Sequence, residues 1–330
     1  MTEKEKLLEV KDLHTYLYLE QGISKALDGI TFDIKKGETL GVVGESGCGK
    51  SMTALSIMQL VPDPPGKIVS GEIRFQGENL LGKSKKEMRE IRGSRIAMIF
   101  QEPMTSLNPV MTVGKQIEET IRIHESVSRA EAKKRAIDML KLVKIPEPQQ
   151  RYHEYPHQLS GGMRQRVMIA IALACHPNLL ICDEPTTALD VTVQAQILKL
   201  IAELQKKTGM SVMLITHDLG VISQVAERII IMYAGRIVEY GTRQSIFANP
   251  LHPYTEALLK SVPRLSDEEG KELYMIKGMV PDLTKEHRGC LFAERCPYTE
   301  KRCLEEEPEL YDTGSGCVCC HRYGKRGNDK

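Results

Sequence analysis

The fold is decided by the stretch Gly44-Glu45-Ser46-Gly47-Cys48-Gly49-Lys50-Ser51, which lies between an apolar run and a helical pattern. A glycine-rich turn in this position lets backbone N–H groups surround phosphate at the start of a helix. The apolar run before it is Thr39–Val43, and the helical pattern after it is Met52–Leu60. In such a P-loop the lysine reaches the β and γ phosphates and the serine supplies an oxygen to Mg2+. These flanks favour a phosphate site over a chance match, and Cys48 fills a variable position.

Four short apolar runs are each followed at once by a group suited to phosphate or Mg2+. Continuous apolar runs of this length are typical of strands buried on both faces of a parallel sheet. Ligands gather at the carboxyl ends of such strands, so we expect an α/β nucleotide-binding fold. The runs with their groups are Thr39–Val43 with Gly44, Ile96–Phe100 with Gln101, Leu179–Cys182 with Asp183 and Glu184, and Val212–Thr216 with His217.

The acidic pair Asp183-Glu184 predicts metal and water chemistry at one of these strand ends. In P-loop enzymes the first acid holds Mg2+, and a neighbouring acid orients the attacking water. The plain alternative is a pair of surface acids, but burying bare carboxylates after four apolar residues is costly without a cation. Gln101 and His217 would mean little alone, and at strand ends we expect both to contact the γ-phosphate or the water.

A second glycine-rich turn, Leu159-Ser160-Gly161-Gly162-Met163-Arg164-Gln165-Arg166, also leads into a helical pattern. It follows a predicted helical insertion, in which Ser128-Arg129-Ala130-Glu131 has the pattern of a capping box. One nucleotide rarely needs two phosphate seats from one chain, so we expect two chains to share their nucleotides. The apolar stripe of the insertion consists of Ala132, Ala136, Met139, Leu140 and Val143.

Composition limits the possible partners. The 330 residues carry a formal charge of +1, which gives no reason to expect a nucleic acid partner. The longest apolar stretch, Val167–Cys175, is far shorter than the ~20 residues that span a bilayer. The N-terminus lacks the apolar region of a secretion signal. We therefore expect a cytoplasmic chain whose membrane role is peripheral.

The end of the chain differs from the rest. Strand and helix patterns stop near Asn249–Thr255, and the remainder is irregular, charged and rich in cysteine. In a reducing compartment, such a cluster more often binds metal than forms disulfides. The six cysteines are Cys290, Cys296, Cys303, Cys317, Cys319 and Cys320.

Taken together, these motifs resemble the ATP-binding subunit of an ABC transporter over about residues 7–260. In family terms Gly44–Ser51 is the Walker A loop, Leu159–Gln165 the signature and Leu179–Asp183 the Walker B strand. Gln101 is then the Q-loop glutamine, Glu184 the catalytic glutamate, Ala188-Leu189-Asp190 the D-loop and His217 the switch histidine. The resemblance implies a P-loop ATPase fold with a mixed or parallel sheet and an inserted helical subdomain.

The resemblance also implies composite sites, in which two subunits pack head to tail and the signature of one closes on the γ-phosphate held by the other. Tyr16 fits best as the residue that stacks on adenine, and Tyr18 stays an alternative. The residues implied to contact ATP are Tyr16, Gly44, Glu45, Ser46, Gly47, Cys48, Gly49, Lys50, Ser51, Met52, Ser160, Gly161, Gly162 and Asp190. Those implied to hold Mg2+ are Ser51, Gln101 and Asp183.

The fit narrows to the dipeptide and oligopeptide importer subgroup, which the stretches 100–109 and 249–255 resemble. Ser51–Met58 resembles its D-type subunit, which pairs with an F-type partner, although a homodimer is the alternative for the isolated chain. Met163 replaces the glutamine that many ABC proteins carry there. The implied partners are two integral membrane permeases and, indirectly, an extracytoplasmic peptide-binding protein, at the cytoplasmic face of a prokaryotic membrane.

The tail resembles the C-terminal extension of this subgroup, which implies a metal site at its four cysteine positions. Loops of five, six and sixteen residues separate them, without the Cys-x-x-Cys pair usual in zinc knuckles. Four thiolates without histidine suit a [4Fe–4S] cluster, so we rank it above Zn2+ and both above free thiols. Cys317 or Cys319 could replace the fourth ligand. The four positions are Cys290, Cys296, Cys303 and Cys320.

We accordingly expect an ATP-binding domain at 1–248, with its helical subdomain at about 103–175, and a C-terminal extension at 249–330. Two rival functions share some of these motifs. A soluble ABC ATPase of translation or DNA repair usually has two cassettes or a long coiled coil, which this sequence lacks. A regulatory subunit with little catalysis would not need Lys50, Asp183, Glu184 and His217 together.

Overall fold

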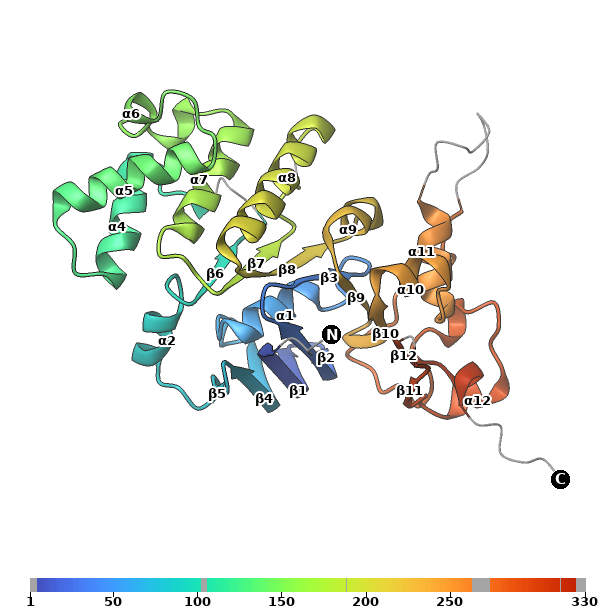
Figure 1. The fold of residues 1–330 in the computed structure, drawn as a ribbon. Coiled ribbons are helices and arrows are strands. Elements are labelled where there is room, and N and C mark those ends of the chain that lie inside the picture. Colours follow the sequence, from blue (N-terminus) through green and yellow to red (C-terminus); the bar gives the residue numbers. More distant parts are fainter. Residues whose placement is uncertain (1–4, 102–105, 188, 263–273, 315, 325–330) are drawn as a thin grey trace. The chain divides into compact units, whose positions relative to one another are not determined.

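The structure is a computed structural model that describes residues 5–101, 106–187, 189–262, 274–314 and 316–324. The chain divides into two compact units, which we describe separately. The signature unit contains Ile34–Thr39 and Asn79–Ile215, and the P-loop unit contains the described parts of Leu8–Asp33, Leu40–Glu78 and Thr216–Lys330. Figure 1 labels the elements along the chain.

The strands of the signature unit form a parallel group, as their continuous apolar runs predict. Strand β7 pairs in parallel with β6 on one side and with β8 on the other. Every residue of β7 and β8 is buried, which requires helices or further structure on both faces. The bounds are β6 (Ile96–Ile99), β7 (Leu179–Asp183) and β8 (Ser211–Thr216).

Helices make up most of the signature unit, and α4, α5, α6 and α7 gather together in Figure 1. Ser128 accepts a hydrogen bond from the Glu131 backbone N–H and so caps α5. The predicted apolar stripe from Ala132 to Val143 is buried, which confirms the helical insertion. The bounds are α2 (Lys85–Ile91), α4 (Val113–His124), α5 (Arg129–Leu142), α6 (Pro148–Arg151), η1 (Pro156–Gln158), α7 (Gly161–Leu173) and α8 (Val191–Thr208).

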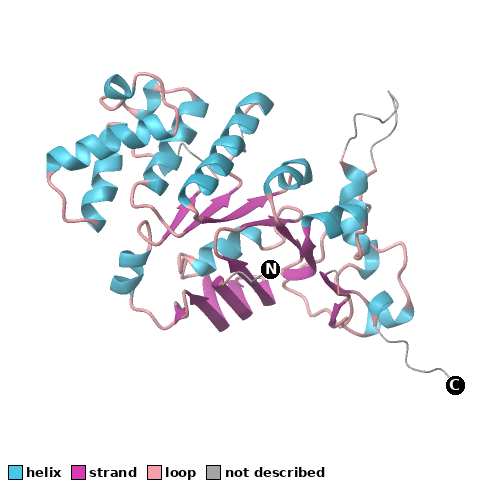
Figure 2. Cartoon of the chain, viewed as in Figure 1, coloured by secondary structure: helices cyan, strands magenta, loops and turns pink. Residues whose placement is uncertain are grey.

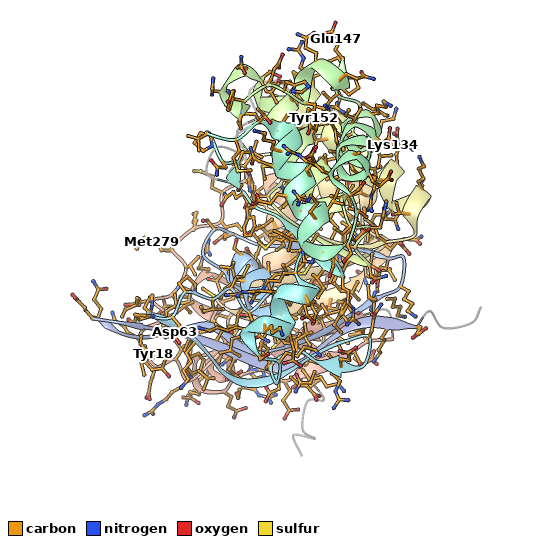
Figure 3. The ribbon with its side chains drawn as sticks, turned by 90° about the vertical axis from the view of Figure 1, so that its left-hand side faces the viewer. Tyr18, Asp63, Lys134, Glu147, Tyr152 and Met279 are labelled. Carbon is orange, nitrogen blue, oxygen red and sulfur yellow. The ribbon has the colours of Figure 1, made fainter. Side chains whose placement is uncertain are left out.

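A buried tyrosine fixes the packing among these helices. Tyr152, labelled in Figure 3, follows α6. Its hydroxyl donates a hydrogen bond to Glu118 of α4. Gly114 allows this contact, because a Cβ at that position would meet the Tyr152 ring at 2.1 Å. Lys133 of α5 lies 5.0 Å from the centre of the same ring. One side chain therefore joins three neighbouring segments.

The P-loop unit contains an antiparallel sheet in which β1 lies between β2 and β4. Figure 2 shows these long strands side by side. Buried residues alternate with more exposed ones along β1 and β2, as in a sheet that is covered on one face. The bounds are β1 (Lys6–Leu19), β2 (Gly22–Lys35), β4 (Gly66–Phe75) and the two-residue β5 (Glu78–Asn79).

A second group of strands in this unit carries the P-loop and continues into the tail. Strand β3 pairs in parallel with β9, and β9 pairs antiparallel with β10. Beyond β10 come β12 and then β11, both antiparallel. The mixed sheet that the sequence predicts is therefore present. The bounds are β3 (Thr39–Val43), β9 (Arg228–Tyr233), β10 (Arg236–Thr242), β11 (Leu310–Asp312) and β12 (Gly316–Cys319).

The tail corrects one expectation, because it is not merely irregular. Its strand β12 hydrogen-bonds to β10, so Val318 is fully buried in the sheet. Phe292, 1% exposed, packs against the rings of Tyr233 and Tyr254. The tail thus shares an apolar core with β9, β10 and α11. A long-range strand pair of this kind leaves little trace in local sequence patterns.

Short helices complete the P-loop unit. Helix α1 begins at the P-loop lysine, two residues earlier than the helical pattern suggests, because the backbone of the turn already starts the helix. In the described part of the chain, no helix is long and apolar enough to cross a membrane. The bounds are α1 (Lys50–Ile57), α9 (Leu219–Val225), α10 (Arg243–Ala248), α11 (Pro253–Ser261), η2 (Ala293–Arg295), α12 (Lys301–Glu305) and η3 (His321–Tyr323).

Candidate functional site

The P-loop lies between β3 and α1, and its glycines are required by the space around the turn. A Cβ at Gly44 would stand 2.2 Å from the Met232 carbonyl oxygen. Gly49 has φ 102°, which L side chains rarely adopt, and its Cβ would meet the Ala26 carbonyl oxygen at 2.6 Å. Ser46 and Gly47 between them are exposed. The turn is therefore packed at its two ends and open at its middle, where backbone N–H groups can face a phosphate.

Lys50 is folded back on the P-loop. Its side chain is buried, with the residue 5% exposed, and Nζ donates hydrogen bonds to the carbonyl oxygens of Gly44 at 2.8 Å and Glu45 at 2.9 Å. Among the described residues, no side chain caps α1 and no acid lies in its first turn. The start of this helix therefore keeps its positive end for an anion. Ser51 and Met52 are half-buried in the same first turn.

The Cys48 side chain is buried within the P-loop, where it packs as a small apolar group. It is 1% exposed, and burial raises the pKa of its thiol. The raised pKa keeps the sulfur protonated and unreactive at neutral pH. Its backbone carbonyl accepts a hydrogen bond from the Gly235 N–H, which links the P-loop to the turn after β9.

Glu184, the predicted catalytic glutamate, accepts hydrogen bonds from Gln101 and Thr187 of the same unit. Gln101 Nε2 donates to Glu184 Oε2 at 3.1 Å, and Thr187 Oγ1 donates to the same oxygen at 3.0 Å. The Glu184 backbone has φ 47°, a left-handed conformation that is uncommon outside glycine. Its N–H bonds to the Ile215 carbonyl of β8. The structure thus brings together two residues that the sequence singles out, and Thr187 is a partner that the sequence analysis missed.

Asp183 and His217 occupy the strand ends expected of them. Asp183 is the last residue of β7, is 5% exposed and pairs with Ile215 of β8. Burial and the adjoining Asp183 carboxylate raise the pKa of the Cys182 thiol before it. His217 follows the last residue of β8 and is exposed. Asp218 after it accepts from the N–H groups of Gly220 and Val221 and so starts α9.

The signature turn also begins a helix, but its surface is open. Ser160 caps α7 by accepting from the Met163 N–H at 3.4 Å, and both Ser160 and Gly161 are exposed. Gly162 packs against α8, where a Cβ would approach Val193 at 2.9 Å. Asp190 caps α8 by accepting from the Val193 N–H at 2.9 Å. The signature and the end of the D-loop are therefore neighbours within one unit.

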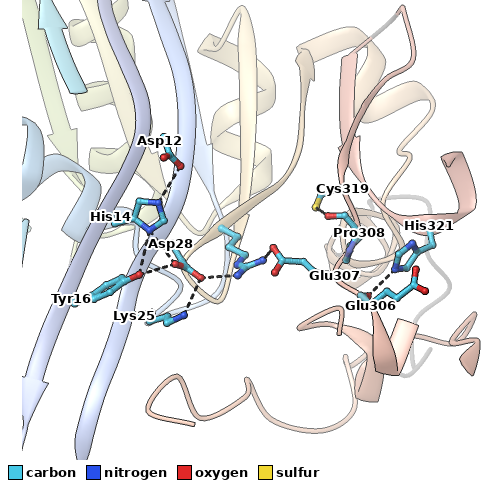
Figure 4. A network of polar contacts seen from close by, with 11 residues as sticks. Asp12, His14, Tyr16, Lys25, Asp28, Glu306, Glu307, Pro308, Cys319 and His321 are labelled. Atoms are coloured by element: carbon cyan, nitrogen blue, oxygen red, sulfur yellow. Dashed lines mark hydrogen bonds and ion pairs between the residues drawn. The ribbon is translucent and has the colours of Figure 1, made fainter. Parts of the chain in front are cut away.

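Tyr16, the candidate for stacking on adenine, belongs to a polar network (Figure 4). Its hydroxyl donates to Asp28 Oδ1 at 3.1 Å, and Arg236 Nη2 donates to the other Asp28 oxygen at 2.6 Å. His14 Nδ1 lies 3.1 Å from Asp28 Oδ1. Tyr18 is 49% exposed. The network fixes the Tyr16 ring in place, and the choice between the two tyrosines stays a prediction.

The tail cysteines approach one another without forming a coordination sphere. The Cys290 N–H donates to the Cys303 carbonyl at 2.8 Å. Burial, with smaller contributions from the thiols of Cys320, Cys303 and Cys296, raises the pKa of Cys290 to about 11. Across the described residues, no three side chains of His, Cys, Asp or Glu are grouped closely enough to hold a metal ion. The metal site therefore remains a prediction here.

Two predicted segments lie partly outside the described residues. These are Ala188 of the D-loop and residues 102–105 after Gln101. The described neighbours Leu189 and Asp190 lie between β7 and α8.

Two glycine turns at helix starts, one after a buried strand and one on a helical insertion, define the class of ATP-binding cassettes. The chain matches the family model "ABC transporter" over residues 27–187 and "Oligopeptide/dipeptide transporter, C-terminal region" over residues 238–303. It is 54% identical to the oligopeptide transport ATP-binding protein OppD of Bacillus subtilis, covering 93% of this chain and 86% of that protein. It is 50% identical to the dipeptide transport ATP-binding protein DppD of Escherichia coli, covering 92% of both.

Solved structures agree with these matches. The ATP-binding cassette MJ0796, solved as a dimer in a post-hydrolysis state bound to ADP and Pi, superposes with a TM-score of 0.65 at 30% identity. The match covers 72% of this chain and 98% of that one. The chain belongs to the ABC transporter family. Its fold is that of the ABC ATPase cassette, with mixed parallel and antiparallel sheets, and it carries the C-terminal region of the oligopeptide and dipeptide transporters.

Proposed function

We propose that this chain hydrolyses ATP to power the import of dipeptides or oligopeptides through a membrane transporter. The observation that carries the proposal is the presence of two glycine turns at helix starts, one in each unit. The P-loop is packed at its ends around a buried lysine, whereas Ser160 and Gly161 of the signature turn are exposed. Relatives named as peptide transport ATP-binding proteins, at 50% identity or more, support the cargo class.

Each unit is proposed to supply part of the chemistry. Backbone N–H groups of the P-loop and Lys50 bind and neutralise the phosphates, which need positive charge as the terminal phosphate leaves. Glu184 accepts a proton from the attacking water and orients it, with Gln101 and Thr187 holding its carboxylate. His217 is proposed to contact the same γ-phosphate. ATP binding then closes two subunits, and hydrolysis lets them reopen.

The donor set fits a magnesium ion. Ser51 offers a hydroxyl, Gln101 an amide oxygen and Asp183 a carboxylate, all oxygen ligands of the kind that Mg2+ prefers. Asp183 is buried at the last position of β7, at the strand end where the sequence predicts the ion. We propose that these three residues hold the ion, which neutralises the triphosphate when bound. The remaining contacts to ATP, from Tyr16 to Asp190, are proposed as the sequence predicts them.

The tail is proposed to hold a [4Fe–4S] cluster through Cys290, Cys296, Cys303 and Cys320, with Zn2+ as the alternative. The raised pKa of Cys290 supports proximity of these thiols, since its neighbours among them contribute to the shift. Cys317 and Cys319 are the alternatives for the fourth ligand. Burial, with smaller contributions from Cys290 and Cys320, raises the pKa of the Cys319 thiol to about 11, which supports its proximity to these two cysteines. An absorbance spectrum of anaerobically purified protein distinguishes the two metals, because only the cluster gives a visible charge-transfer band.

The proposed partners follow from the same family. They are a second ABC ATPase subunit, either a copy of this chain or an F-type chain, and two permease subunits in the membrane. An extracytoplasmic peptide-binding protein would act indirectly. The chain would then lie at the cytoplasmic face as a peripheral subunit, with an ATP-binding domain at 1–248 and its extension at 249–330. Copurification with the permeases tests this assembly.

The substitution Glu184→Gln tests the proposed chemistry. Removing the general base should lower hydrolysis about a hundredfold or more while ATP still binds. The variant should accumulate as an ATP-bound dimer, which size-exclusion chromatography with Mg2+ and ATP detects. Hydrolysis near the wild-type rate would show that Glu184 is not the base.

A further inference from the structure

Glu45 of the P-loop is held by two residues from far along the chain. Its carboxylate receives two hydrogen bonds from one guanidinium: Arg295 Nη1 to Oε2 at 2.8 Å and Nη2 to Oε1 at 3.0 Å. Its backbone N–H donates to the Tyr254 hydroxyl at 2.9 Å. Arg295 lies in the cysteine-rich tail and Tyr254 lies in α11. All three residues belong to the P-loop unit.

The arginine in this contact is rigidly placed. Its side chain is 6% exposed, against 26% for Glu45, and Nη1 also donates to the Tyr233 hydroxyl at 3.2 Å. The guanidinium carbon lies 5.6 Å from the centre of the Tyr233 ring and 5.9 Å from that of Phe292. A buried guanidinium that donates two parallel hydrogen bonds to one carboxylate fixes the orientation of that carboxylate as well as its distance. The bond to Glu45 raises the pKa of Arg295, so the pair stays ionised.

The contact reaches the phosphate-binding lysine through the backbone of Glu45. The Glu45 carbonyl accepts from Lys50 Nζ at 2.9 Å and from the Cys48 N–H at 3.3 Å. A fixed Glu45 therefore fixes both the first half of the turn and the resting place of the lysine.

We propose that Arg295 is a positioning residue for the nucleotide site. Through Glu45 it holds the P-loop in the form that accepts the triphosphate, so nucleotide affinity depends on the folded cysteine-rich tail. This inference rests on the proposed function, because it concerns the same ATP site. Arg295 forms the end of η2, which runs between Cys290 and Cys296, so the segment that orders these two thiols also orders the arginine.

The test is a binding titration of Mg2+ and ATP with Arg295→Gln, Glu45→Gln and the double variant. Arg295→Gln should weaken ATP binding about tenfold, an effect of the size that coupled sites show, while kcat at saturating ATP changes little. Because both singles break the same contact, the double variant should bind no more weakly than either single. Arg295→Lys keeps the positive charge but cannot donate two parallel hydrogen bonds to Glu45. Its affinity for ATP should therefore lie between those of the wild type and Arg295→Gln.

The matched control is Arg302→Gln, in the same tail. Arg302 Nε donates to Glu306 at 2.8 Å, but both side chains are largely exposed and lie within one short helical turn. Its ATP affinity should equal that of the wild type. If Arg295→Gln does not fold, the double variant, which leaves neither charge unpaired, carries the measurement and should show the same tenfold loss.

The outcomes separate this inference from the function on which it rests. A folded Arg295→Gln protein that binds ATP as tightly as the wild type would overturn the role of Arg295 and leave the ATPase proposal intact. An equal loss in Arg302→Gln would also overturn it. A wild-type protein that does not bind ATP would overturn the proposed function and this inference with it.

Discussion

The two glycine-rich turns of this chain make the same local structure in opposite surroundings. In the P-loop unit, Gly44 and Lys50 are buried, and the turn is tied to β9, α11 and the tail. In the signature unit, Ser160 and Gly161 are exposed, although Leu159 and Gln165 on either side of them are buried and Gly162 packs closely on α8. The P-loop therefore packs against residues of its own unit, whereas Ser160 and Gly161 leave the start of α7 accessible to solvent. This difference is what a site shared by two chains requires.

The largest effects are expected from single substitutions that disrupt one turn at a time. Lys50→Ala should abolish both ATP binding and hydrolysis, since the lysine is proposed to bind the phosphates held by the P-loop. Ser160→Arg should leave ATP binding by a single subunit near wild type but lower hydrolysis about a hundred- to a thousandfold, the cost of losing transition-state donors. ATP affinity and turnover are measured for both. Loss of ATP binding in Ser160→Arg would mean that the two turns have the same role.

The stability of the P-loop unit should depend on pH through the buried His252. His252 is 1% exposed, and burial lowers its pKa to about 3 from 6.5. Its Nδ1 accepts a hydrogen bond from the Tyr254 N–H, and its backbone N–H donates one to Glu239 Oε2. Between these values the unfolded chain binds a proton that the folded chain does not. Stability should therefore fall as the pH drops below about 6.5, by about 2 kcal/mol at pH 5.

The variant His252→Asn keeps an acceptor near the Tyr254 N–H but does not titrate. Its free energy of unfolding, measured in denaturant at about pH 7 and about pH 5, should lose that 2 kcal/mol difference. The pH slope of the wild type includes every other group, so the difference between the two proteins isolates His252. Equal slopes would show that the imidazole charges in the folded state.

The smallest predicted effect is at the Glu184 carboxylate. Gln101→Ala removes the hydrogen bond from Gln101 Nε2 to Glu184 Oε2, whereas Thr187 Oγ1 still donates to the same oxygen. We expect kcat to fall about tenfold, with ATP binding little changed, because a loosened base is less well oriented. Steady-state kinetics measure both quantities. A loss as large as that of Glu184→Gln would show that Gln101 acts chiefly through the proposed Mg2+ site and not through the orientation of Glu184.

Much of this organisation is readable from the sequence because it is local. The four strand ends follow from apolar runs, and the helical insertion follows from its stripe and its Ser128 cap. The contact of Arg295 with Glu45 could not be predicted, since 250 residues separate the two and neither local pattern points to the other. The pairing of β12 with β10 is hidden for the same reason. Long-range partners are chosen by packing, which a local pattern does not encode.

The most direct test of shared sites mixes two inactive chains. Lys50→Ala supplies an intact signature turn and Ser160→Arg supplies an intact P-loop. Equal amounts of the two should recover about a quarter of the wild-type hydrolysis rate, because half of the dimers are mixed and each of those has one complete site. A mixture as inactive as its two components would contradict the account.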